Sequence, residues 1–331
     1  MKKFTYLLLA VLFASFLAAC GGASSNTTSS GTYKVAVVMP SAINDLAFSQ
    51  SMYDALMKIQ AERGADKFEV AVSDGVFVVE DAAAAIRDYA SKGYNLIIAH
   101  GSQYGASLKE IAPDFPNTTF AWGTAGDTFG LPNVFAYEAL SQEGGYVNGV
   151  MAAALSTSGT IGVVGPIEVG DAKLYVDGFK AGAMAQNPAI QINVNYIGSF
   201  SDVALASEAA QTHAAAGADV MTGSAQMVVG AIGVAEQQGI LWFGTQSDQS
   251  SLAPKIVVAS QVYDWTVVIN DILDLMSKGT LGGKVYAVSL ANQGLLIKFN
   301  PDYSLPAEVK TLAENTIKGI QDGSIKVEVG Q

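Results

Sequence analysis

The feature that most constrains the fold is a repeated alternation of short apolar segments with longer amphipathic ones. Most of the short segments lack the polar alternation of a half-exposed strand, so they predict strands that are buried on both faces. These predicted strands cover 34–40, 68–74, 95–101, 119–123, 133–137, 160–165, 190–198, 219–223, 240–244, 256–262 and 285–290. Between many of them, apolar residues recur at helical spacing, over 46–63, 80–92, 142–156, 173–186, 203–216, 226–238, 265–276 and 309–320. This order predicts an α/β fold with helices on both faces of parallel sheets.

The chain length and the number of strands indicate more than one domain. The chain has 331 residues, and a typical domain contains about 150. The predicted strands therefore fit two lobes better than one. Half of the residues are hydrophobic, so the chain can bury enough apolar surface to offset the entropy of ordering, which excludes intrinsic disorder.

Charge and residue usage exclude several classes of function. The chain has 18 Lys and Arg against 30 Asp and Glu, a formal charge of −12, which argues against a nucleic-acid partner. It has one Cys and two His, which excludes a disulfide framework and leaves little material for a metal site. No glycine-rich loop ends in Gly-Lys-Ser or Gly-Lys-Thr, so the P-loop for ATP hydrolysis is missing. We expect neither a metal nor a cofactor.

The first residues carry the pattern of an export signal. Lys2 and Lys3 precede an apolar run over 4–19, which is shorter than the ~20 residues that a membrane-spanning helix needs. The run ends in Leu-Ala-Ala-Cys-Gly, which resembles a bacterial lipobox. The alternative is an ordinary signal peptide with a chance Cys. We expect a signal peptide over 1–19, a lipidated Cys20 and a flexible tether over 20–33. The protein would then be anchored to the outer face of a bacterial cell membrane.

Candidate binding residues follow the predicted strands, because ligands of open α/β sheets bind beyond the carboxyl ends of the strands. These loops cover 40–48, 101–105, 123–127, 165–166, 198–202, 223–226 and 244–249. They contain small residues, carboxylates, amides and a few aromatic residues. That mixture suits a small polar ligand with a flat face.

Several motifs resemble those of one known family. Ile-Asn-Asp followed two residues later by Phe-Ser-Gln-Ser is similar to the first-loop motif of the basic membrane protein family, the substrate-binding lipoproteins of ABC importers that include purine-nucleoside receptor A. Further motifs match in family order across nearly the whole chain after its N-terminal segment. The matching segments are 43–45, 48–51, 137–138, 159–165, 177–182, 196–202 and 247–249.

The resemblance implies an architecture and a function. It implies two Rossmann-like lobes with parallel sheets, of the type I periplasmic-binding-protein architecture, joined by three hinge crossings. The lobes would comprise 34–136 plus 262–291 and 137–261 plus 292–331. A purine nucleoside or purine base would bind between them and be delivered to an ABC transporter permease by a monomeric protein that is not an enzyme. The alternatives are a sugar-binding receptor of the same fold and an extracytoplasmic enzyme that acts on a nucleoside or a sugar.

The resemblance also implies a set of ligand-binding residues. The aromatic side chains of this set offer faces for stacking on a base, and its carboxylate side chains accept hydrogen bonds from the ligand. The set is Asn44, Asp45, Phe48, Ser102, Trp122, Phe200, Ser224, Gln246, Asp248 and Tyr263. The alternative for Asn44 and Asp45 is helix capping, and for Phe48 and Phe200 it is core packing. Gln246 replaces a family acid, and Tyr263 stands where nucleoside-binding members often have Lys, so we expect a free base to bind at least as well as its nucleoside.

Five other polar residues are expected to bind neither a ligand nor a metal. His100 ends a predicted strand and is expected to be a core or loop residue rather than a ligand contact. His213 lies on an Ala-rich predicted helix and is expected at the surface. Glu168, Asp171 and Asp177 lack the spacing of a calcium loop, so we expect solvated carboxylates.

Overall fold

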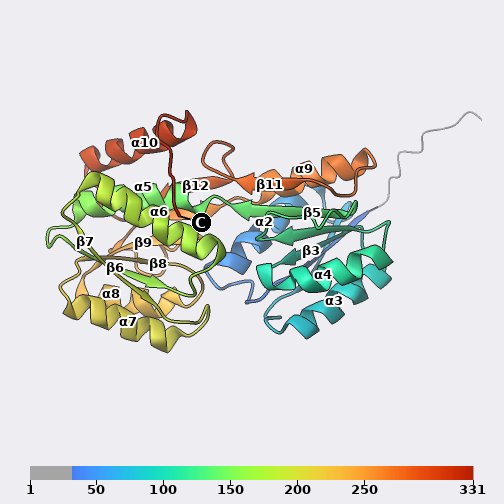
Figure 1. Cartoon of the computed structure of the whole chain (residues 1–331), viewed down its shortest axis with the longest axis horizontal. Coiled ribbons are helices and arrows are strands. Elements are labelled where there is room, and N and C mark those ends of the chain that lie inside the picture. Colours follow the sequence, from blue (N-terminus) through green and yellow to red (C-terminus); the bar gives the residue numbers. More distant parts are fainter. Residues whose placement is uncertain (1–31, 331) are drawn as a thin grey trace, which may run out of the picture. The chain divides into compact units, whose positions relative to one another are not determined.

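The computed structural model describes residues 32–330, which form two six-stranded sheets with helices on both faces of each (Figure 1). The expected signal peptide, Cys20 and most of the tether lie outside the described residues. No helix within residues 32–330 is both long and apolar enough to cross a membrane.

In the first sheet all neighbouring strands are parallel. Their order is β11-β5-β4-β3-β1-β2. The strands are β1 (Tyr33–Val38), β2 (Phe68–Ser73), β3 (Leu96–His100), β4 (Thr119–Gly123), β5 (Val134–Ala139) and β11 (Val285–Val288). The helices are α2 (Phe48–Arg63), α3 (Val79–Ser91), α4 (Gly105–Ile111) and α9 (Thr266–Ser277). In β1, Val35 and Val37 pack in the core with α2, whereas Ala36 and Val38 pack with α3 and α4. Burial on both faces explains why the sequence shows no polar alternation there.

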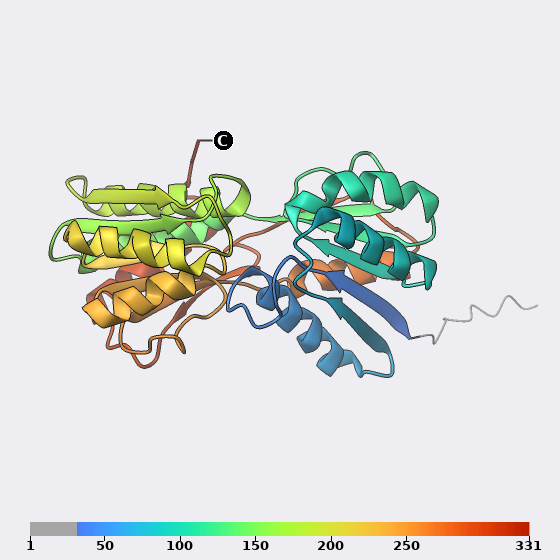
Figure 2. The same ribbon diagram turned by 90° about the horizontal axis from the view of Figure 1, so that it is seen from below.

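The second sheet has the order β12-β10-β9-β8-β6-β7 and is parallel except for the antiparallel pair of β12 and β10. Its strands are β6 (Thr160–Gly165), β7 (Gln191–Tyr196), β8 (Val220–Gly223), β9 (Leu241–Gln246), β10 (Val257–Tyr263) and β12 (Leu295–Phe299). Its helices are α5 (Ser141–Leu155), α6 (Gly170–Gln186), α7 (Val203–Ala215), α8 (Val228–Gln238) and α10 (Ala307–Gln321). Figure 2 shows α7 and α8 over one face of this sheet, and α3 and α4 over the corresponding face of the first.

The chain crosses between the two sheets three times within residues 32–330, after β5, after β10 and after β11. The α/β fold with two parallel-dominated sheets therefore confirms the expected architecture. The expected lobe boundaries after residues 136 and 261 fall inside β5 and β10, whose strands continue to Ala139 and Tyr263. The expected boundary after residue 291 falls between β11 and β12.

Helices α5 and α6 pack through glycines that allow their backbones to approach closely. A Cβ atom built on Gly149 would lie 2.0 Å from the carbonyl oxygen of Phe179, and one built on Gly182 would lie 2.0 Å from that of Tyr146. Gly145 and Gly178 make similar approaches one helical turn earlier. Any larger residue at these positions forces the two helices apart, because protein interiors are already close-packed.

The prediction that His213 lies at the surface is wrong. The side chain is 1 % exposed, and its Nε2 lies 3.1 Å from the carbonyl oxygen of Val163. Gly162 makes room for the imidazole, since a Cβ there would lie 2.6 Å from the Cβ of His213. Burial lowers the pKa of His213, so the residue is a neutral hydrogen-bonded part of the core.

Candidate functional site

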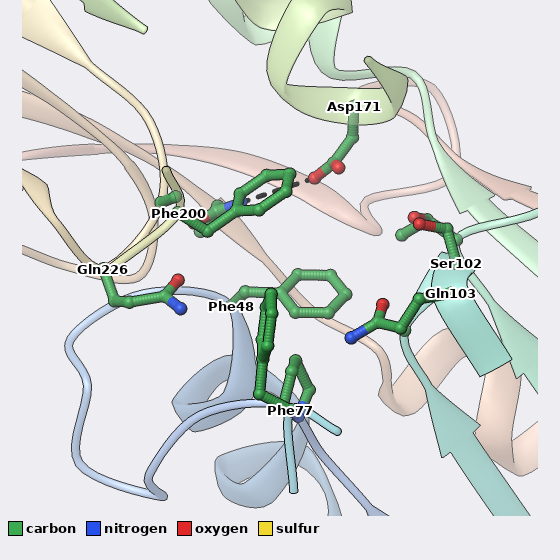
Figure 3. Close-up of a pocket in the computed structure, with 12 residues that line it drawn as sticks. Phe48, Phe77, Ser102, Gln103, Asp171, Phe200 and Gln226 are labelled. Atoms are coloured by element: carbon green, nitrogen blue, oxygen red, sulfur yellow. Dashed lines mark hydrogen bonds between the residues drawn. The ribbon is translucent and has the colours of Figure 1, made fainter. Parts of the chain in front are cut away.

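A pocket of about 140 Å³ lies at the carboxyl ends of strands from both sheets (Figure 3). Loops of the first sheet and the start of α2 contribute Pro40, Phe48, Phe77, Gly101, Ser102, Gln103 and Thr124. The second sheet contributes Phe200, Ala225 and Gln226 from its loops, Asp171 from the first turn of α6 and Gln246 from the end of β9. The pocket therefore lies where open α/β sheets bind their ligands.

Phe48 forms a rigid aromatic wall of this pocket. Its ring stacks on the imidazole of His100, with centroids 3.9 Å apart and planes inclined by 9°. His100 is fully buried, and its Nε2 lies 3.2 Å from the Phe48 carbonyl oxygen while its Nδ1 lies 2.7 Å from the Tyr137 hydroxyl. Because a carbonyl only accepts, Nε2 donates to Phe48 and Nδ1 accepts from Tyr137. One face of Phe48 is thus covered, and the other is left for the pocket.

The state of His100 follows from the same contacts. Burial lowers the pKa of His100 to about 3, so the imidazole is neutral at physiological pH. This supports the expected core role, because His100 supports Phe48 from behind and is absent from the pocket lining.

Two further aromatic side chains reach the pocket from loops. Phe200 follows β7, and its carbonyl oxygen accepts a hydrogen bond of 3.1 Å from the backbone N–H of Met227, which ties two loops of the second sheet together. Phe77 follows β2 and is 55 % exposed. In Figure 3 the rings of Phe48, Phe77 and Phe200 converge on one space. The site therefore offers several faces to a flat ligand.

Asp171 supplies the carboxylate of the pocket. It lies in the first turn of α6, and its Oδ2 accepts a hydrogen bond of 2.9 Å from the Tyr263 hydroxyl and a longer contact of 3.4 Å from Gln246 Nε2. Burial raises the pKa of Asp171, and these two hydrogen bonds oppose the rise. The expectation that Asp171 is a solvated carboxylate is therefore wrong, because its side chain lines the pocket instead.

Tyr263 connects Asp171 to two of the chain crossings. Its hydroxyl also lies 2.7 Å from Ser141 Oγ. Since an ionised carboxylate only accepts, Tyr263 donates to Asp171 and accepts from Ser141. Tyr263 is the last residue of β10 and Ser141 is the first residue of α5, so this hydroxyl lies between the two crossings.

Two buried polar atoms beside the pocket lack a partner within residues 32–330. They are Gln246 Oε1 and Ser224 Oγ. Gln246 lines the pocket, and Ser224 directly precedes Ala225 of the lining. Buried polar groups are nearly always hydrogen-bonded in native proteins, so these atoms are candidates for contact with a ligand.

The charge of the lining restricts the ligand. Among the lining residues, all from the described part of the chain, Asp171 is the charged side chain and there is no Lys, Arg or His. A phosphate or carboxylate ligand would meet this carboxylate with no cation to offset the repulsion. The pocket suits a neutral ligand that carries hydrogen-bond donors.

The predicted site residues fall into three groups. Phe48, Ser102, Phe200 and Gln246 line the pocket. Ser224 adjoins the lining, and Tyr263 contacts it through Asp171. The other four predicted residues, which are absent from the lining, are Asn44, Asp45, Trp122 and Asp248.

Asp45 makes the contacts of a helix-capping residue. Asn44, by contrast, is exposed. The carboxylate of Asp45 accepts hydrogen bonds at the start of α2 from the backbone N–H groups of Ala47, Ser49 and Gln50. These contacts match the capping interpretation, which the sequence left open beside the ligand role.

Trp122 and Asp248 are engaged elsewhere. Trp122 donates through Nε1 to the carbonyl oxygen of Gly101 at 3.2 Å, and its ring stacks on Phe129. Asp248 is exposed, and its Oδ1 accepts from the backbone N–H and the hydroxyl of Ser250.

Sequence reasoning missed several lining residues, among them Phe77, Gln103, Asp171 and Gln226. Gln103 and Gln226 lie in loops that were recognised as candidate binding loops, so position alone could have found them. Asp171 lies in the first turn of the helix that follows the predicted strand 160–165. Its place beyond the carboxyl end of that strand was the available signal.

A family model described as PnrA-like ABC transporter substrate-binding protein matches residues 32–328. The chain belongs to the PnrA-like family. It is 30% identical over 278 residues to a purine-binding protein of Brucella abortus, covering 84% of this chain and 78% of that protein. It is also 30% identical over 251 residues to the transcriptional activator protein Med of Bacillus subtilis, covering 76% of this chain and 77% of that protein.

Solved structures agree on the fold. An ABC transporter solute-binding protein from Conexibacter woesei superposes with a TM-score of 0.76 at 21% identity, covering 90% of this chain and 99% of that one. The PnrA-like family consists of solute-binding proteins rather than enzymes, so membership implies a small-molecule ligand and a transporter permease as partner. The match of the family model, together with relatives named basic membrane proteins, confirms the resemblance to the basic membrane protein family.

Proposed function

We propose that this PnrA-like protein captures a purine, with the free base bound at least as tightly as its nucleoside, and delivers it to an ABC importer. The observation that carries the proposal is the Phe48 ring, which is stacked on a buried neutral His100 and faces a pocket shared with Phe200. A wall held in this way suits stacking on a heteroaromatic ring. The relative from Brucella abortus is named a purine-binding protein, which supports the same ligand class.

The size and polarity of the pocket support a free base. An apolar cavity of about 150 Å³ accommodates benzene, and the pocket has a similar volume of about 140 Å³. Three of the expected ligand-binding residues offer few free groups to a ribose. Asp45 is occupied in capping α2, Gln246 replaces the family acid, and Tyr263 is bonded to Asp171.

We also propose that the protein acts outside the cytoplasm, anchored through a lipid on Cys20. This rests on the lipobox-like sequence and on the single Cys of the chain. Two lobes held on a Ser- and Thr-rich tether could capture a ligand close to a permease in the membrane.

Isothermal titration calorimetry tests the ligand class. The full chain is titrated with adenine, guanine, hypoxanthine, their nucleosides, glucose and ribose, and the recovered ligands are analysed after incubation. We expect purines to bind with one site, bases at least as tightly as nucleosides, and every ligand to be recovered unchanged. A preference for a sugar over every purine would overturn the ligand assignment, and a cleaved nucleoside would show an enzyme instead.

A further inference from the structure

The carboxylate of Asp171 is held in one position by its surroundings. Its Oδ2 accepts from the Tyr263 hydroxyl at 2.9 Å and faces Gln246 Nε2 at 3.4 Å. The backbone N–H groups of Asp171 and Ala172, at the start of α6, also lower the pKa of this carboxyl. A carboxylate has about four acceptor positions, and the side chain lines the pocket. An anchored acceptor is thus presented to the ligand.

The orientation of Gln246 follows from the same contact. If the amide were flipped, its oxygen would face a carboxylate oxygen, so the amide nitrogen must face Asp171. This leaves Oε1 as the free atom of Gln246, and it is buried without a partner in the described chain. The polar edge that the second sheet contributes here therefore consists of two acceptors, Asp171 and Gln246 Oε1.

An edge of acceptors selects a ligand edge of donors. Guanine presents two adjacent donors, its ring N1–H and its 2-amino group, and Oδ1 of Asp171 can accept from both, since Tyr263 and Gln246 engage Oδ2. Hypoxanthine presents the ring N–H alone. Xanthine flanks that N–H with two carbonyl oxygens that a carboxylate repels, and adenine places its amino group beside acceptor nitrogens.

We propose that Asp171 is the specificity-determining residue of the pocket and selects a purine with two adjacent N–H donors, of the guanine type. The inference rests on the proposed function, because it assumes a purine ligand. Tyr263 is a positioning residue that acts through Asp171, since its hydroxyl fixes Oδ2.

The test compares four bases on the full chain and three variants. Guanine, hypoxanthine, xanthine and adenine are titrated in displacement calorimetry against wild type, Asp171→Asn, Tyr263→Phe and the control Asp177→Asn. Asp177 lies on the same helix, outside the pocket lining, in an ion pair with Lys173. Melting curves check that every variant is folded.

We expect wild type to bind guanine most tightly and xanthine much more weakly. A hydrogen bond to a charged group gives about ten- to a hundredfold in affinity, so Asp171→Asn should lose that factor for guanine and less for hypoxanthine. Tyr263→Phe should narrow the ratio of guanine to hypoxanthine affinity, and Asp177→Asn should leave it unchanged.

Three results would overturn the inference. If wild type binds adenine or xanthine as tightly as guanine, the pocket does not select a base with two adjacent N–H donors. If Asp171→Asn weakens all four bases equally, Asp171 is structural. Both results leave purine capture standing. If wild type binds no purine at all, the proposed function fails together with the inference.

Discussion

Truncation of Phe48 is the most direct test of the aromatic wall. Phe48→Ala removes the ring that separates His100 from the pocket. Stacking of a base on an aromatic side chain contributes about 1–3 kcal/mol by alanine substitution. Because each 1.4 kcal/mol is tenfold in affinity, the purine affinity should fall by about five- to a hundredfold.

The same substitution also affects stability, and the assay must separate the two effects. Replacing a fully buried Phe by Ala lowers the free energy of unfolding by about 3–5 kcal/mol. Phe48 is half-buried, so we expect Phe48→Ala to lower it by about 2 kcal/mol. Thermal denaturation without ligand defines a temperature at which wild type and variant are both folded. Calorimetry with a purine base is then performed at that temperature.

A matched control is provided by Phe129. Its ring stacks on Trp122 in the same lobe but does not line the pocket, so Phe129→Ala should keep wild-type affinity. If folded Phe48→Ala binds the base as tightly as wild type, the stacking argument is wrong. If both variants lose affinity equally, the loss reflects general loosening of the lobe.

Further predictions concern stability and anchoring. Gly182→Ala should destabilise the fold by about 1–3 kcal/mol through overpacking. Gly233→Ala should stabilise it by about 0.5–1 kcal/mol, because a Cβ there meets no atom of residues 32–330 within 4 Å. Equal melting temperatures of the two variants would contradict this. Burial raises the pKa of Asp219, but hydrogen bonds from Ser156, Ser158 and Thr157 outweigh it and lower the pKa to about 2. Because the folded-state pKa is depressed, about 1 kcal/mol of stability, discounted for solvent screening, should be present above pH 4 and lost as the pH falls toward 2. In acid denaturation, Asp219→Asn should lose less stability between pH 4 and pH 2 than wild type does. Cys20→Ser should accumulate as an unprocessed precursor in the native host, and normal processing and anchoring in a fractionation experiment would contradict the lipobox.

The sequence predicted the strands well where burial on both faces left an unbroken apolar run. β3 is such a strand, since all five of its residues are buried. β12 was missed because it is an edge strand that pairs antiparallel on one side, and it includes the half-exposed residues Leu296 and Ile297 and the exposed Lys298. Tertiary pairing, rather than local pattern, defines such a strand.

The site shows a different limit of sequence reasoning. Phe48 and Phe200 were recognised because motifs surround them, and both line the pocket. Asp45 has the same motif support, yet capping α2 occupies its carboxylate. Asp171 has no motif support and gains its place because α6 begins beside the end of β10. Which of two carboxylates faces a ligand depends on hydrogen bonds between distant segments, and spacing along the chain does not encode these.

The Tyr263 hydroxyl joins the pocket to two segments through which the chain crosses between the sheets. One oxygen atom contacts the carboxylate that faces the ligand and the first residue after another crossing of the chain. If a ligand donates to Asp171 as proposed, the hydrogen bonds of the Tyr263 hydroxyl to Asp171 and Ser141 should change in strength. These bonds lie in the segments that connect the lobes. Substitutions at Tyr263 should therefore alter the rate at which ligand is released together with its affinity.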